Sequence, residues 1–122
     1  MQIILFLLLF ITNSVCADES YISDDEYAKM LYKNPRGIGC NKCHGENGEG
    51  KEISSYISGK NKISLIGPRI NNLSMYQFKK ALRKGKRLMP EYFLTDEEKA
   101  HLYYYLIKQN RKGVKFANSD KQ

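Results

Sequence analysis

Three residues in the first half of the chain form a compact chemical motif, Cys40, Cys43 and His44. Two thiols at this spacing lie on one helical turn, so each can add to one vinyl group of the same haem. A histidine directly after the second cysteine then lies under the iron and can bind it. This C-x-x-C-H spacing is typical of c-type haem attachment. The motif predicts one haem c, bound covalently through both cysteines.

Other uses of the two thiols fit the sequence less well. A thioredoxin-like redox pair requires a βαβ context, and no strand pattern precedes Cys40. A structural zinc site needs four ligands, and beyond the motif only His101, from a distant segment, could supply the fourth. A disulfide between Cys40 and Cys43 would close almost no loop and would stabilise the chain little.

A haem iron has a second axial position, and four residues could occupy it: Met30, Met75, Met89 and His101. Pro90 restricts the backbone of Met89 to extended conformations, which suits a rigid loop that presents a thioether to a metal. Met30 and Met75 lie in helical patterns, where methionine usually fills the core. His101 falls within the last predicted helix, at its surface or flank. We therefore favour Met89.

Three helices are predicted to position these groups. The segments 23–33 and 95–109 each begin with a capping box, in which a Ser or Thr is followed by Glu three positions later. The segment 74–84 begins with an N-cap serine, and Gly85 after it is suited to the C′ position. The first helix presents an apolar face made of Tyr27, Ala28, Leu31 and Tyr32.

The segment Gly45–Leu65 is polar and rich in Gly, Ser and Lys. We expect a long irregular loop there, with one helical turn near Ile53–Ile57. A structureless loop of this length in a small domain is expected to wrap something, such as a prosthetic group. The predicted fold class is therefore all-α, with three main helices wrapped around one covalently bound haem.

The chain begins with 17 uncharged residues, Met1–Ala17, which contain an unbroken apolar run, Ile3–Ile11. This run has the length of a signal-peptide core and ends in small residues suited to cleavage before Asp18. We expect a signal peptide over residues 1–17 and a periplasmic protein. The alternative is an uncleaved segment that anchors the domain to the membrane.

The chain has 122 residues, and this length excludes a multidomain enzyme. Its net charge is +7. Residues 18–110 are expected to form one domain, followed by a basic, flexible tail over 111–122.

Six cations cluster just before Met89, at Lys79, Lys80, Arg83, Lys84, Lys86 and Arg87. The cluster is either a solvated helix face or a docking patch for an acidic redox protein. Nucleic acid is not an expected partner of an exported protein.

The motifs together resemble the class I monohaem cytochromes c over roughly Asp24–Gln109. The resemblance rests on their order along the chain: Leu31-Tyr32, Cys40–Gly45, Gly67-Pro68, Gly85, Met89-Pro90 and Leu94–Glu98. Two departures stand out. The link Asn34–Gly39 is longer than in the family, so the first helix could end early. Lys99 replaces a residue that is often apolar, which predicts a wetter start of the last helix.

The resemblance implies the roles of five site residues. Cys40 and Cys43 would hold the haem, and His44 and Met89 would be its axial ligands. The carbonyl of Pro68 would accept the other ring N–H of His44 and so orient the imidazole. The resemblance also implies that the first helix crosses the last one through two apolar sets: Ala28, Leu31 and Tyr32 against Leu102, Tyr105 and Leu106.

With both axial positions filled by the protein, no substrate reaches the iron, so we expect a monomeric one-electron carrier rather than an enzyme. The resemblance implies a shuttle between respiratory redox partners. Two alternatives stay open: a gas sensor or small haem enzyme in which Met89 is labile, and the haem subunit of a larger dehydrogenase.

Overall fold

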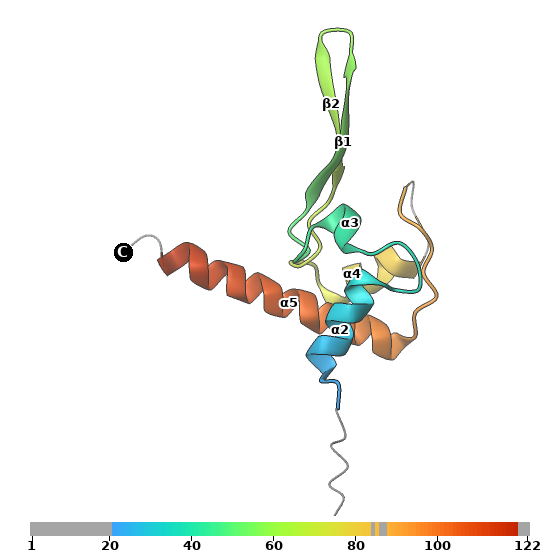
Figure 1. Ribbon diagram of the computed structural model, residues 1–122, viewed down its shortest axis with the longest axis vertical. Helices are drawn as coiled ribbons and strands as arrows, with labels where there is room; N and C mark the ends of the chain where they lie inside the picture. The colour runs from blue at the N-terminus through green and yellow to red at the C-terminus, as the bar shows by residue number, and fades with distance from the viewer. Residues whose placement is uncertain (1–20, 84, 86–87, 120–122) are drawn as a thin grey trace, which may run out of the picture.

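A computed structural model describes residues 21–83, 85 and 88–119 of the chain. The elements along these residues are α2 (Asp24–Lys33), α3 (Asn41–His44), β1 (Lys51–Ser58), β2 (Asn61–Gly67), α4 (Met75–Arg83) and α5 (Asp96–Ser119), as Figure 1 shows. The predicted signal peptide lies outside the described residues. So do Lys84, Lys86 and Arg87 of the basic cluster. In the described part, no helix is both long enough and apolar enough to cross a membrane.

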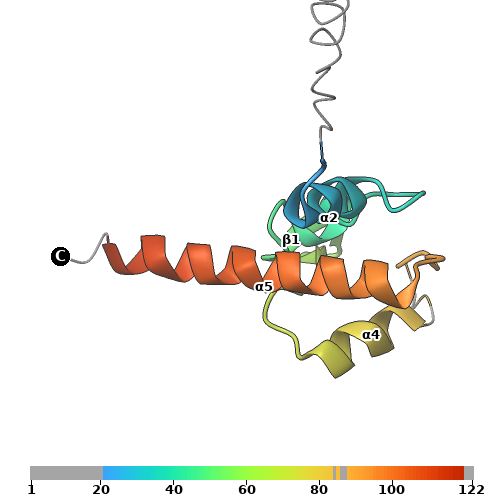
Figure 2. The same cartoon turned by 90° about the horizontal axis from the view of Figure 1, so that it is seen from below.

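The core forms where α5 lies between α2 on one side and α4 on the other (Figure 2). The predicted crossing of the first and last helices is confirmed: Tyr32 and Tyr105 stack with ring centroids 5.8 Å apart. α4 adds Phe78 and Leu82 from the opposite side. The buried apolar residues form one cluster: Ala28, Leu31, Tyr32, Phe78, Leu82, Leu94, Leu102, Tyr105 and Leu106.

All three predicted N-caps are confirmed. Ser23 accepts a hydrogen bond from the amide of Glu26, and the Glu26 side chain bonds back to the amide of Ser23. Ser74 forms the same reciprocal pair with Gln77. Thr95 and Glu98 form it at the start of α5. Each pair satisfies backbone donors that the first helical turn leaves free. The C′ role of Gly85 depends on Lys84, which lies outside the described residues.

The expectation of an all-α fold is wrong. The described residues contain an antiparallel hairpin of β1 and β2 in addition to four helices. Neither an irregular loop nor a helical turn near Ile53–Ile57 occurs there. The reason is local: this segment contains isoleucine and tyrosine, and β-branched and aromatic residues favour a pleated backbone over a helix.

The turn of the hairpin has a recognisable chemistry. Ser58 pairs with Asn61, so Gly59 and Lys60 form a two-residue connection. Gly59 has a φ of 63°, a left-handed conformation that glycine adopts without strain. A positive φ at the first turn position matches the twist of antiparallel strands. The register shifts between Glu52 and Ser54, where a bulge bends β1 near its base.

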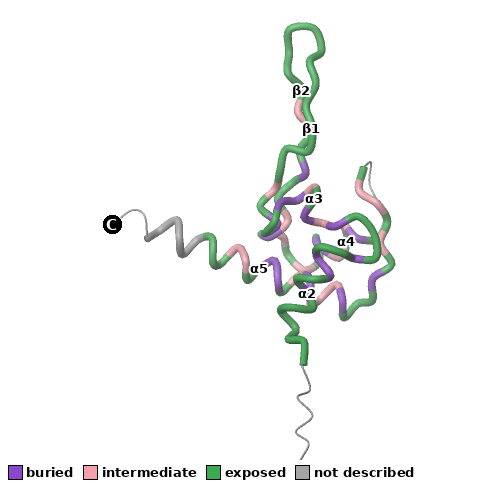
Figure 3. The backbone as a smooth tube through the Cα atoms, viewed as in Figure 1, coloured by how far each residue is buried: buried purple, intermediate pink, exposed green. Residues whose placement is uncertain are grey.

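α5 is longer than predicted and continues past Gln109 to Ser119. Once a helix is established, each further residue adds one backbone hydrogen bond, so a helix can extend beyond its capped and packed first turns. Figure 3 shows buried backbone concentrated where α2, α4 and α5 meet, whereas the hairpin is exposed almost throughout. At the start of α5, Lys99 is half-buried and its Nζ lies 3.3 Å from Asp96.

Candidate haem site

The C-x-x-C-H motif forms the short helix α3. The amides of Cys43 and His44 both donate to the carbonyl of Cys40, at 3.3 and 2.9 Å, which closes one helical turn. Both thiols are free and partly buried, with no disulfide between them. Burial raises the pKa of Cys40 to about 11, so this thiol is protonated at neutral pH. The turn thus brings two unoxidised thiols and an imidazole together on one short segment.

His44 is buried and held by a single ring contact. Its Nδ1 lies 2.7 Å from the carbonyl oxygen of Pro68, which can only accept a hydrogen bond. Nδ1 must therefore carry a proton, which leaves Nε2 as the ring nitrogen that can bind a metal. This is the contact that the resemblance implies. It fixes both the tautomer and the rotation of the imidazole.

The base of the hairpin is built directly onto this motif. The amide of Gly50 donates to the carbonyl of His44 at 2.8 Å. At the other strand, a Cβ atom on Gly67 would come within 1.7 Å of the Cys43 carbonyl oxygen. Only glycine permits this approach. Gly67 therefore allows Pro68, the next residue, to reach the ring of His44.

α2 reaches the motif through Tyr32. Its hydroxyl donates to the carbonyl of Gly45 at 2.7 Å, and its own carbonyl accepts from the amide of Cys40 at 2.9 Å. Burial raises the pKa of Tyr32, which keeps the hydroxyl protonated as a donor. α2 does not end early. It ends at Lys33 as its pattern predicts, and the long link Asn34–Gly39 is accommodated after it.

Met89 lies partly buried against the core. The same set of partly buried residues packed on the core contains Cys40, so the two segments share one apolar support. Gly85 lies close to the carbonyl of Met89, because a Cβ on Gly85 would be 2.7 Å from that oxygen. Gly85 and Met89 therefore lie close together in space. Whether Met89 binds iron stays a prediction at this point.

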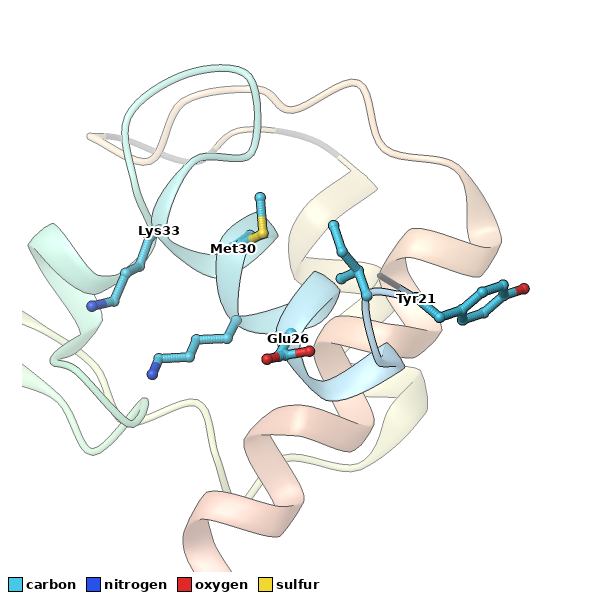
Figure 4. Close-up of a pocket in the computed structure, with 6 residues that line it drawn as sticks. Tyr21, Glu26, Met30 and Lys33 are labelled. Atoms are coloured by element: carbon cyan, nitrogen blue, oxygen red, sulfur yellow. The ribbon is translucent and has the colours of Figure 1, made fainter. Parts of the chain in front are cut away.

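The other candidate ligands lie in different surroundings. Met30 is exposed and lines an open depression of about 570 Å³ on α2 together with Tyr21 and Lys33 (Figure 4). No residue of the C-x-x-C-H motif lines that depression. His101 packs edge-on against Tyr27, with ring centroids 5.8 Å apart. Among the described residues, no three His, Cys, Asp or Glu side chains are placed so that they could hold one metal ion.

Two hydrogen bonds tie the long link to the segment after Met89. The hydroxyl of Tyr92 donates to the carbonyl of Ile38 at 2.7 Å. Arg36 donates to the carbonyl of Phe93, also at 2.7 Å. Sequence reasoning missed both contacts, because neither partner belongs to a recognised motif and the residues are far apart in the chain. The long link therefore supports the loop that carries Met89.

Arg36 also forms a bidentate pair with Glu98. Its two terminal nitrogens each lie 2.8 Å from one carboxylate oxygen. Glu98 is buried and also accepts from the hydroxyl of Tyr27 and the amide of Thr95. The guanidinium of Arg36, followed by the Thr95 amide, lowers the pKa of Glu98 to about 2. One carboxylate thus joins the link, α2 and the start of α5.

The donor set fits a covalently bound haem. Two free thiols three residues apart can form thioethers, and His44 can bind a metal through Nε2. Partly buried apolar residues that pack on the same core as Cys40 can supply the contact surface that a large macrocycle needs, namely Ile70, Leu73, Met89, Tyr92 and Tyr103.

The fold and the motif together define a small c-type cytochrome domain. Residues 23–106, well over half of the chain, match the family described as "Cytochrome C oxidase, cbb3-type, subunit III". The chain belongs to this family of c-type cytochrome domains, which are generally electron carriers and imply a covalently bound haem c. No curated protein and no solved structure matches the chain.

Proposed function

We propose that the protein is a one-electron carrier with a single haem c attached through Cys40 and Cys43. His44 Nε2 and the Met89 thioether are the two axial ligands. The observation that carries this proposal is the 2.7 Å contact between His44 Nδ1 and the Pro68 carbonyl. It orients the imidazole and leaves Nε2 as the ring nitrogen that can bind a metal, as a histidine ligand requires.

When bound, the haem supplies an iron that gains and loses one electron. The Pro68 carbonyl accepts a hydrogen bond from Nδ1–H of His44, which strengthens Nε2 as a metal ligand. The Met89 thioether is a soft neutral donor and favours the reduced state. Tyr92 and Arg36 hold the segment after Met89 in place. With both axial positions taken by side chains, the protein transfers electrons without binding a substrate at the metal.

We further propose that residues 1–17 direct export to the periplasm, where respiratory redox proteins with acidic surfaces are the partners. The net charge of +7 and the uncharged, apolar start of the chain support this. N-terminal sequencing of protein recovered from a periplasmic fraction tests it. A mature N-terminus at Asp18 is expected, whereas an intact Met1 in the membrane fraction would support an anchor.

The absorption spectrum of the matured protein tests the ligand assignment. We expect a ferric methionine–iron charge-transfer band and a ferrous spectrum that carbon monoxide does not change. Met89→Ala should keep the covalent haem, lose the band, lower the potential and admit carbon monoxide. Met75→Ala is the matched control and should behave as the unmodified protein. An unchanged potential in Met89→Ala would refute the assignment. A carbon monoxide response in the unmodified protein would favour the open-site sensor or enzyme.

Covalent attachment is tested separately by denaturing electrophoresis with haem staining, together with intact mass. The unmodified protein should carry one haem that survives denaturation. Cys40→Ala and Cys43→Ala should each retain at most one thioether, and the double variant should lose the haem on denaturation.

Purification of the untagged protein from its own cells tests the alternative that it is the haem subunit of a dehydrogenase. Copurification in a stable complex with a dehydrogenase would contradict a free electron carrier.

A further inference from the structure

The hairpin of β1 and β2 projects away from the helices (Figure 1). Every residue of β1 is exposed, and β2 is buried only at Gly67, where it meets the haem motif. A two-stranded hairpin that packs on nothing gains little stability from its own pairing. The core of the domain therefore does not explain why this element carries large apolar side chains.

The outer half of the hairpin has large apolar side chains on both faces, although Ile57 on the second face pairs with Lys62. Tyr56 pairs with Ile63, so these two side chains lie on one face. Ile57 is the next residue and therefore lies on the other face. Tyr56 is 60% exposed and Ile57 is 73% exposed. Docking flat against a protein surface would require only one apolar face. Large apolar side chains on both faces, with a lysine beside Ile57, fit an environment that surrounds the tip.

The charges of the tip are of one sign. Between Ile53 and Ile66 the sequence has no acidic residue and has two lysines, Lys60 and Lys62. Glu52, nearer the base, lies 3.4 Å from the Nζ of Lys62. Exposed apolar side chains beside lysines match a bilayer surface with anionic headgroups, where tyrosine is also favoured. A second copy of this chain is a poor match, because it carries the same positive charge.

We propose that the tip of the hairpin, residues 56–63, binds the surface of an anionic lipid bilayer. Tyr56, Ile57 and Ile63 enter the headgroup region, and Lys60 and Lys62 contact the lipid phosphates. The depth of insertion is limited to the tip, since the free backbone edges of both strands must stay hydrated. The base of the hairpin is fixed to the haem motif through Gly50 and Gly67, so binding holds the motif at a set distance from the membrane.

Vesicle co-sedimentation of the matured haem protein tests this directly. The probes are vesicles of phosphatidylcholine alone and of equal parts phosphatidylcholine and phosphatidylglycerol. We expect binding to the anionic vesicles only, weakening as salt is added. The pair Lys60→Ala and Lys62→Ala should weaken binding roughly thirtyfold. The pair Tyr56→Ser and Ile57→Ser should weaken it by about tenfold or more. Both pairs should keep the haem spectrum and the thermal midpoint, because these residues lie outside the core.

Two matched controls remove similar groups elsewhere. Tyr76→Ser with Tyr104→Ser deletes exposed aromatics on α4 and α5, and Lys29→Ala with Lys112→Ala deletes exposed lysines. Neither control pair should reduce binding by more than about twofold, which is small beside the expected loss of two interfacial lysines. The proposal is overturned if the unmodified protein does not sediment with anionic vesicles, or if the tip and control variants bind equally. It is also overturned if light scattering shows a dimer that the tip variants dissociate.

Discussion

Gly67 lies so close to Cys43 that a Cβ atom on the glycine would come within 1.7 Å of the Cys43 carbonyl oxygen. This contact brings the end of β2 against the backbone of the haem motif. It also sets the position of Pro68, whose carbonyl holds the ring of His44. The orientation of the predicted iron ligand thus depends on a residue that touches no cofactor.

Gly67→Ala should disrupt the site. The added methyl group meets backbone, which cannot move aside like a side chain, so β2 and Pro68 must shift away from α3. We expect poor haem incorporation and a loss of stability of about 2 kcal/mol or more, as for other overpacked positions. Haem content per protein and the thermal midpoint measure this. Gly113→Ala in α5 is the control, because a Cβ there meets nothing within 4 Å, and it should be neutral or slightly stabilising.

Tyr92→Phe should loosen the segment that carries Met89. The variant loses the hydrogen bond to the Ile38 carbonyl, which is expected to contribute about 1 kcal/mol. We expect the ferric methionine–iron band to disappear at a lower temperature than in the unmodified protein, before global unfolding. Tyr104→Phe, at an exposed position, is the matched control. If the band and the global transition shift together by the same amount, Tyr92 has no specific effect on Met89.

Glu98→Gln should change how stability depends on pH. The pKa of Glu98 is about 2 in the folded chain, below the ordinary value of 4.5, so ionisation favours folding. Its contribution is complete above about pH 4.5 and is lost as the pH falls towards 2. We expect a cost of about 2 kcal/mol at neutral pH, because the half-exposed Arg36 is partly screened. Denaturant unfolding at several pH values should show the two proteins converging near pH 2.

The cations of α4 should affect the rate of electron transfer more than stability. Lys80 and Arg83 are exposed and belong to the basic cluster before Met89. Reversing both charges should slow oxidation by anionic hexacyanoferrate about tenfold at low salt, with the difference vanishing at high salt. A cationic cobalt complex should react faster with the same variant. Lys29→Glu on α2 tests whether the position of the charge matters. An equal effect per charge there would mean that the rate depends on the net charge of the protein and not on the location of the basic cluster.

Local chemistry in the sequence determined much of this protein. The C-x-x-C-H motif forms its turn through hydrogen bonds between neighbouring residues, and each capping box that starts a helix spans only four residues. The face of α5 that meets α2 followed from the resemblance, since the six consecutive residues Leu102–Ile107 of α5 are all apolar or tyrosine and their periodicity does not distinguish one face. The hairpin was predictable in principle from two strand-forming runs separated by Gly59 and Lys60, but the polar composition of the segment favoured a loop instead.

Only the tertiary structure decided how the loops are held together. Arg36 meets Glu98, and Tyr92 meets the carbonyl of Ile38, across long stretches of chain. A carbonyl is present at every residue, so no residue type marks Ile38 or Phe93 as an acceptor. The approach of Gly67 to Cys43 likewise depends on where β2 ends relative to α3. Such contacts depend on the packing of whole elements, whereas caps and the haem motif depend on neighbours in the chain.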